Sequence, residues 1–165
     1  MNKEEYNIII KDILSNGKVL ELDNHIHHKT TRLTHSKRVS YYSYLVCKKL
    51  NLDYVSTARG GLLHDFFLNN YHDESSYKLL RNHPLIAYNN ASKYFKLNNK
   101  ERNIIESHMF PINIKHIPKY KESYIVSTVD KIVGVYEKII GYSNEFKILS
   151  SNRIVYILIL IMLNY

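Results

Sequence analysis

Cysteine, tryptophan, glycine and proline are scarce in this chain of 165 residues, which has one Cys, no Trp, five Gly and three Pro. The single thiol, Cys47, excludes an intrachain disulfide, and a chain without disulfides suits the reducing environment of the cytoplasm. The low content of Gly and Pro leaves few interruptions along the chain. We therefore expect long helices.

Long apolar runs are also missing. The most apolar stretch, residues 154–163 (IVYILILIML), is short of the roughly 20 residues that a membrane-spanning helix needs. We expect it to form a buried helix or strand, or a dimer contact, with shallow membrane attachment as an alternative. The first residues, MNKEEYNIII, have no signal-peptide pattern, because acidic residues precede a very short apolar run.

Acidic residues are too few to balance the basic ones, and the formal net charge is +8 at pH 7. This charge favours anionic partners such as phosphates, nucleotides or nucleic acid, although a general bias towards Lys explains it equally well. No compact Arg-rich block is present, so nucleic acid is not an expected partner. Since 45% of the residues are hydrophobic and no linker or repeat is visible, we expect residues 1–165 to form one domain.

Apolar residues recur at steps of three and four, and no segment alternates convincingly between apolar and polar residues. The expected fold is therefore all-α, a helical bundle. Gly60-Gly61 within a helix costs stability and indicates close approach by a neighbouring backbone. Helices are expected over residues 3–15, from Thr34 to about 50, over 53–68, from His83-Pro84 to about 95, from a capping signature at Asn98 and Glu101 to 110, and over 122–140.

Several of these helices place an imidazole or a carboxylate among apolar residues. The residues in question are His35, His64-Asp65, His108 and Asp130. A buried charge is costly unless it is paired or binds a metal. A single instance is typical of a satisfied polar group in the core, but several together predict a shared metal site. Imidazole and carboxylate ligands without thiolate suit Fe, Mn, Zn, Co, Ni or Mg.

A second His-Asp dipeptide, His72-Asp73, lies in the polar stretch LNNYHDESS, where water can solvate both side chains. We expect no metal there, although the pair is a candidate for the rim of a pocket. The same surface expectation applies to the remaining histidines, His25, His27, His28 and His116.

The segments LTHSKRVSYYSYLV, RGGLLHDFFL and IVSTVDKIVG together resemble the HD-domain superfamily of metal-dependent phosphohydrolases over about residues 33–140. Two more histidines, in RNHPLIA and IIESHMF, fall where the two-metal members carry additional ligands. The resemblance implies two metal positions that share Asp65 as a bridge. The first would use His35, His64, Asp65 and Asp130, and the second Asp65, His83 and His108.

The pattern is similar to a group of bacterial HD proteins and to the diadenosine tetraphosphatases of the superfamily. It departs from the subgroup that degrades cyclic dinucleotides, which has a second His and a Glu where this chain has Met109 and Phe110, and whose GYP signature is absent here. Cyclic di-GMP is therefore not the expected substrate.

The resemblance implies hydrolysis of a phosphoester or phosphoanhydride in a nucleotide or dinucleotide. Two divalent metal ions, with Fe or Mn favoured, would hold a bridging water that attacks phosphorus as hydroxide. Asp65 and His64 would be the catalytic pair. Arg38 and Lys131 are candidates for phosphate contacts, with solvated surface roles as the alternative.

Two other functions remain open from the sequence. A di-iron oxygenase of the same superfamily would need the same ligands. A non-catalytic nucleotide-binding regulatory module is the other alternative, and the presence of all six expected ligands argues against it. Residues 17–32, 69–82 and 110–120 are expected to shape the pocket.

Overall fold

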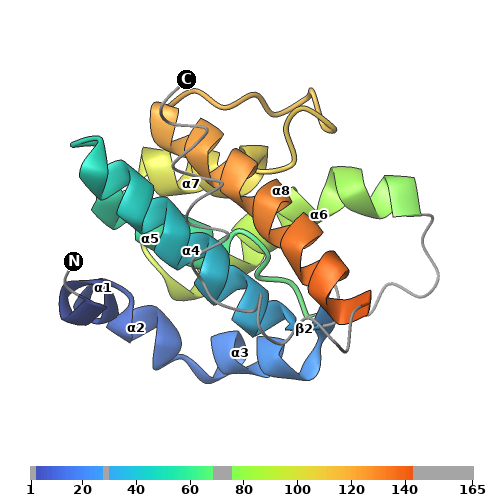
Figure 1. The fold of residues 1–165 in the computed structure, drawn as a ribbon, viewed down its shortest axis with the longest axis horizontal. Coiled ribbons are helices and arrows are strands. Elements are labelled where there is room, and N and C mark those ends of the chain that lie inside the picture. Colours follow the sequence, from blue (N-terminus) through green and yellow to red (C-terminus); the bar gives the residue numbers. More distant parts are fainter. Residues whose placement is uncertain (1–2, 28–29, 69–75, 143–165) are drawn as a thin grey trace.

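The computed structural model describes residues 3–27, 30–68 and 76–142. They form an all-α fold (Figure 1), as the sequence predicts. His28, His72-Asp73 and the apolar run at 154–163 lie outside the described residues. The elements are α1 (Lys3–Ile9), α2 (Lys11–Leu14), α3 (Gly17–Leu20), the 3-10 helix η1 (Glu21–Asn24), β1 (Ile26–His27), β2 (Thr30–Thr31), α4 (Arg32–Lys49), α5 (Tyr54–Leu63), α6 (Ser76–Tyr94), α7 (Asn99–Ser107) and α8 (Lys121–Tyr142).

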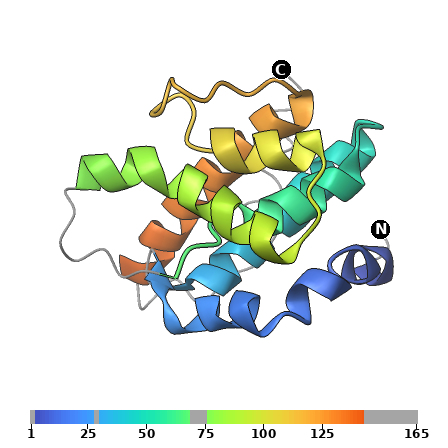
Figure 2. The same cartoon turned by 180° about the vertical axis from the view of Figure 1, so that it is seen from behind.

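The helices α4, α5, α7 and α8 form the centre of the bundle. Helix α5 lies against both α4 and α7, and α8 packs across α4 (Figure 1). From behind, α6 and α7 cover the opposite side (Figure 2), and the short N-terminal helices run along one edge. None of the described helices is long and apolar enough to cross a membrane.

Two adjacent glycines of α5, Gly60 and Gly61, lie in close contact with neighbouring helices. A Cβ atom at Gly60 would lie 2.9 Å from Cγ2 of Ile104 on α7, and one at Gly61 would lie 3.1 Å from Cα of Ser40 on α4. The glycines therefore let α5 fit between its two neighbours. The buried side chains around this contact are apolar, and they include Leu62, Leu63, Ile104 and Ile105.

Several helix ends differ from the expected positions. The first helix breaks at Ile10 into α1 and α2, and Tyr6, Ile10 and Ile13 stay buried across the break. Helix α4 begins before Thr34, because the Thr31 side chain accepts a hydrogen bond from the Thr34 amide. Both residues have the chemistry of an N-cap, and the two-residue antiparallel pairing of β1 with β2, which the pattern did not predict, gives Thr31 the extended backbone that a cap needs.

Helix α5 ends at Leu63, five residues earlier than expected, so His64 and Asp65 follow the helix instead of lying within it. The His64 ring caps the end: its Nδ1 lies 2.8 Å from the carbonyl oxygen of Gly61, one of the last carbonyls that have no partner inside the helix.

Helix α6 begins at Ser76, so His83 and Pro84 lie inside it and do not open it. A proline inside a helix costs about 3 kcal/mol, because it removes a hydrogen bond and crowds the preceding turn. The burial of His83, Ala87 and Ala91 along one face of α6 offsets this local cost. The capping prediction for α7 is confirmed, since Asn98 and Glu101 form a reciprocal capping box.

Candidate metal centre

Six polar side chains predicted as metal ligands converge at one place in the bundle. Each comes from a helix or from the residues that end one, and five of the six are buried, Asp130 being partly exposed. They are His35 on α4, His64 and Asp65 after α5, His83 on α6, His108 after α7 and Asp130 on α8. Five separate segments, far apart in the sequence, therefore bring these side chains together.

The first group of ligand atoms belongs to His35, His64 and Asp130, whose nitrogen and oxygen atoms all lie within 4.8 Å of one another. The Oδ1 atom of Asp130 is 3.0 Å from Nε2 of His35 and 3.5 Å from Nε2 of His64. Atoms that bind one metal ion at about 2.0–2.2 Å must lie roughly 3 Å apart. The spacing in this group is close to that requirement.

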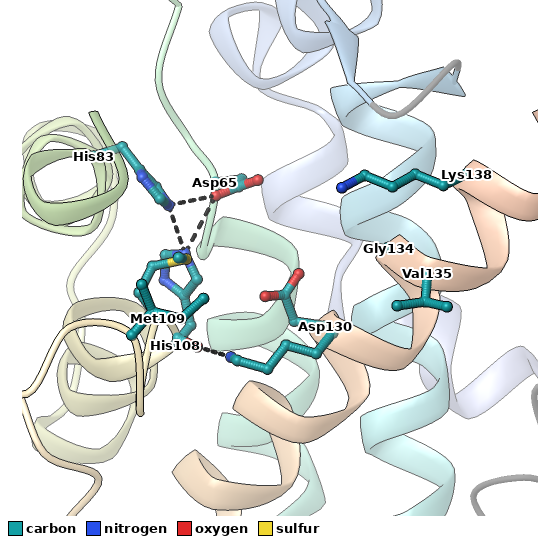
Figure 3. A pocket seen from close by; sticks show the side chains of 10 residues that line it. Asp65, His83, His108, Met109, Asp130, Gly134, Val135 and Lys138 are labelled. Carbon is teal, nitrogen blue, oxygen red and sulfur yellow. Dashed lines mark hydrogen bonds and ion pairs between the residues drawn. The ribbon is translucent and has the colours of Figure 1, made fainter. Parts of the chain in front are cut away.

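The second group contains His64, Asp65 and His108, with His83 against them. The Nε2 atoms of His83 and His108 are 2.8 Å apart, and each is 3.4 Å from Oδ1 of Asp65. Figure 3 shows these three side chains pointing toward one another. The other carboxylate oxygen of Asp65, Oδ2, lies 3.7 Å from Nε2 of His64. Asp65 thus lies between the two groups.

The hydrogen bonds of the histidine rings fix which nitrogen faces the cluster. Nδ1 of His64 donates to the carbonyl oxygen of Gly61, and Nδ1 of His108 donates to that of Ile105, each at 2.8 Å. Since a carbonyl only accepts, Nδ1 carries the hydrogen and Nε2 presents a lone pair to the cluster. Within the described part of the chain, the buried Nε2 of His64 makes no hydrogen bond. A buried acceptor of this kind fits a bound cation.

The electrostatics of the first group show strong mutual stabilisation. Burial of the His35 ring disfavours its charged form, but hydrogen bonds to Asp130 and Glu137 outweigh burial and raise the pKa of His35 to about 10. Burial would likewise raise the pKa of Asp130, but His35 and His64 hold that pKa well below its usual range. Asp130 is therefore an ionised carboxylate that favours positive charge beside it.

Sequence reasoning missed Glu137, which is buried beside the first group. Its Oε2 accepts a hydrogen bond from Nδ1 of His35 at 2.8 Å, and its Oε1 accepts one from Nη1 of Arg38 at 2.7 Å. Glu137 lies two helical turns after Asp130, on the same face of α8, and this spacing is the signal that could have identified it. Arg38 was predicted to contact phosphate, but in the structure its guanidinium group donates to Glu137.

A pocket of about 350 Å³ opens onto the cluster. The candidate ligands Asp65, His83, His108 and Asp130 line it together with the apolar side chains of Met109, Ile112 and Val135. Lys131, the other predicted phosphate contact, lines this pocket, but its ammonium group donates to the carbonyl oxygens of His108 and Ser127 and to the Ser127 hydroxyl. The metal-ligand groups found among the described residues do not include His25 or His116.

Lys138, which was not predicted, also lines the pocket. Figure 3 shows its side chain extending across the pocket toward Asp65. No hydrogen bond or ion pair engages its ammonium group within residues 3–27, 30–68 and 76–142.

Comparison with known proteins gives one match. The family model described as HD domain matches residues 32–151, which is more than half of the chain. No curated protein and no solved structure matches.

Proposed function

Since this chain belongs to the HD domain family, we propose that it is a metal-dependent phosphohydrolase that cleaves a phosphoester or phosphoanhydride in a nucleotide or dinucleotide. The observation that carries the proposal is the convergence of four histidines and two aspartates from five separate segments on one buried cluster. The donor set contains no thiolate, which suits hard or borderline divalent cations such as Mn²⁺ or Fe²⁺.

The two groups of ligand atoms support two metal positions. His35, His64 and Asp130 would hold the first, and His83 and His108 the second. Asp65 would serve both positions, because its two carboxylate oxygens face different groups. Ions held by these residues would supply an activated water as the nucleophile and positive charge for the phosphoryl oxygens.

The remaining residues of the pocket bind and orient the substrate. Of the two lysines among the described residues that line the pocket, Lys138 is the one available to contact a phosphate group, since Lys131 already donates to protein acceptors. The apolar lining residues Met109, Ile112 and Val135 would contact the less polar part of the substrate, such as a nucleobase. The volume of the pocket falls in the range typical of small-ligand sites.

A screen for hydrolysis, in which the nucleotide products are separated by chromatography and inorganic phosphate is measured beside them, tests the function. Purified protein supplied with Mn²⁺ or Fe²⁺ is incubated with nucleoside phosphates, dinucleoside polyphosphates and cyclic dinucleotides. We expect hydrolysis of at least one of the first two classes, and a fall to the background rate in Asp65→Ala. The Asp23→Ala variant is the control, since Asp23 is exposed and lies outside the cluster.

The outcome also distinguishes a phosphohydrolase from an oxygenase. Full activity in Asp65→Ala would contradict the proposed function. Turnover that depends on oxygen and hydrolyses no phosphate bond would favour an oxygenase, so the screen is run both in air and under anaerobic conditions.

A further inference from the structure

Glu137 is a buried carboxylate on α8 that links two side chains of α4. One of its oxygens accepts a hydrogen bond from His35, and the other accepts one from Arg38. Its charge would be costly at 4% exposure without partners for both oxygens. Arg38 supplies the compensating charge, and the bond to Glu137 fixes the orientation of the His35 ring.

The other two rings with a known Nδ1 partner are held differently. His64 and His108 donate to the backbone carbonyls of Gly61 and Ile105, which are neutral acceptors. A carboxylate is a stronger acceptor than a carbonyl, and it makes the imidazole a better electron donor through its second nitrogen. Of these three rings, that of His35 is therefore the strongest electron donor to a metal ion through Nε2.

The two groups also differ in their access to solvent. The side chains of His35 and His64 are 0% exposed, and neither is among the residues that line the pocket. Asp130, which is 14% exposed, is the member of the first group that lines it. The first group therefore meets the pocket through one carboxylate, whereas Asp65, His83 and His108 all line it.

We propose that Glu137, held in place by Arg38, is a positioning residue for His35, and that it makes the His35–His64–Asp130 group the tighter-binding of two unequal metal positions. This inference rests on the metal site of the proposed function. It assigns Arg38 to the support of the first metal position and leaves phosphate recognition to Lys138.

Calorimetric titration of the full-length, chelator-treated chain with Mn²⁺ tests the proposal without any assay of activity. Wild-type protein should show two binding steps with different Kd values. Glu137→Gln keeps an oxygen that can accept from His35 but removes the negative charge. It should weaken the tighter step by about 10- to 100-fold and leave the weaker step unchanged.

The control is Glu21→Gln, which makes the same change of charge at an exposed ion pair with Lys18. Both binding steps should be unchanged in this variant. If Glu137→Gln binds Mn²⁺ like wild type, or loses only the weaker step, the proposal is wrong. Wild-type protein that takes up no metal would instead refute the proposed function itself.

A second pair of variants keeps the proposal testable if Glu137→Gln does not fold. His35→Gln should lose the tighter step and His83→Gln the weaker one, each with the other step retained. The reverse assignment would overturn the inference while leaving a two-metal phosphohydrolase intact. Circular dichroism of the metal-free variants confirms that each is folded before titration.

Discussion

The contrast between Lys131 and Lys138 shows how the neighbours of a residue decide its role. Both residues are on α8, and both line the same pocket. The ammonium group of Lys131 is bound by three acceptors from His108 and Ser127, so it holds α8 to the end of α7. Lys138 has no such partners among the described residues, and under the proposed function we expect its ammonium group to contact a phosphate group of the substrate.

We expect Lys138→Ala to raise the KM for a phosphorylated substrate by about tenfold, because one charge-assisted hydrogen bond contributes roughly 1.5 kcal/mol. Lys138→Arg should keep most of the affinity. Steady-state kinetics give the values, with Lys121→Ala, an exposed lysine at the start of α8, as the control. An unchanged KM in Lys138→Ala would exclude this contact.

Most of the candidate ligands could be predicted from the sequence because they interrupt apolar stretches, whereas His83 was predicted only through the resemblance to the HD-domain superfamily. Glu137 could not be predicted, since VGVYEKII has the appearance of an ordinary amphipathic turn in which Glu faces water. Its burial depends on Arg38 and His35, about 100 positions away in the sequence. Contacts of this range leave no local pattern.

The sequence predicted a helix end correctly where residues close in the sequence determine that end. The capping box of Asn98 and Glu101 starts α7 as expected, and the amphipathic pattern of α8 agrees with its bounds within about two residues. The ends of α5 and α6 are set by tertiary contacts instead. His64 leaves the helix to cap it, and the core contacts of α6 keep it helical through Pro84.

The close packing of α5 against α7 predicts that a side chain at Gly60 destabilises the fold. Gly60→Ala should destabilise the protein by about 1–3 kcal/mol, because the new Cβ would lie 2.9–3.1 Å from the Ile104 side chain. Gly17→Ala is the control, since nothing lies within 4 Å of a Cβ at Gly17. Urea unfolding of both variants measures the difference. Equal stability of the two would mean that α5 and α7 are not in close contact.

Across the whole molecule, Arg59 connects the N-terminal helices to the bundle. From α5 it donates to Asp12 on α2 at 2.6 Å and to Glu101 on α7 at 2.9 Å. The hydrogen bond from Arg59 lowers the pKa of Asp12. A carboxyl whose pKa is lower in the folded state stabilises the fold above its unfolded pKa and loses this contribution as pH falls through the folded pKa.

Asp12→Asn should therefore reduce the free energy of unfolding at pH 7, by at most about 1 kcal/mol because Asp12 is largely exposed. The difference from wild type should shrink as the pH falls below about 4. Urea unfolding with a chelator present, at several pH values between 7 and 3, checks this. A difference that stays constant with pH would rule out an ionic contribution from Asp12.

The central claim is that the cluster binds divalent metal ions, and elemental analysis of the purified protein tests it most directly. The protein is produced in medium containing Fe, Mn, Zn and Co, then freed of loosely bound ions by gel filtration. We expect about two divalent ions per wild-type chain and a loss of them in Asp65→Ala, which keeps the helical circular dichroism spectrum. Wild-type protein that carries no transition metal, or Asp65→Ala protein with the same content as wild type, would contradict the account.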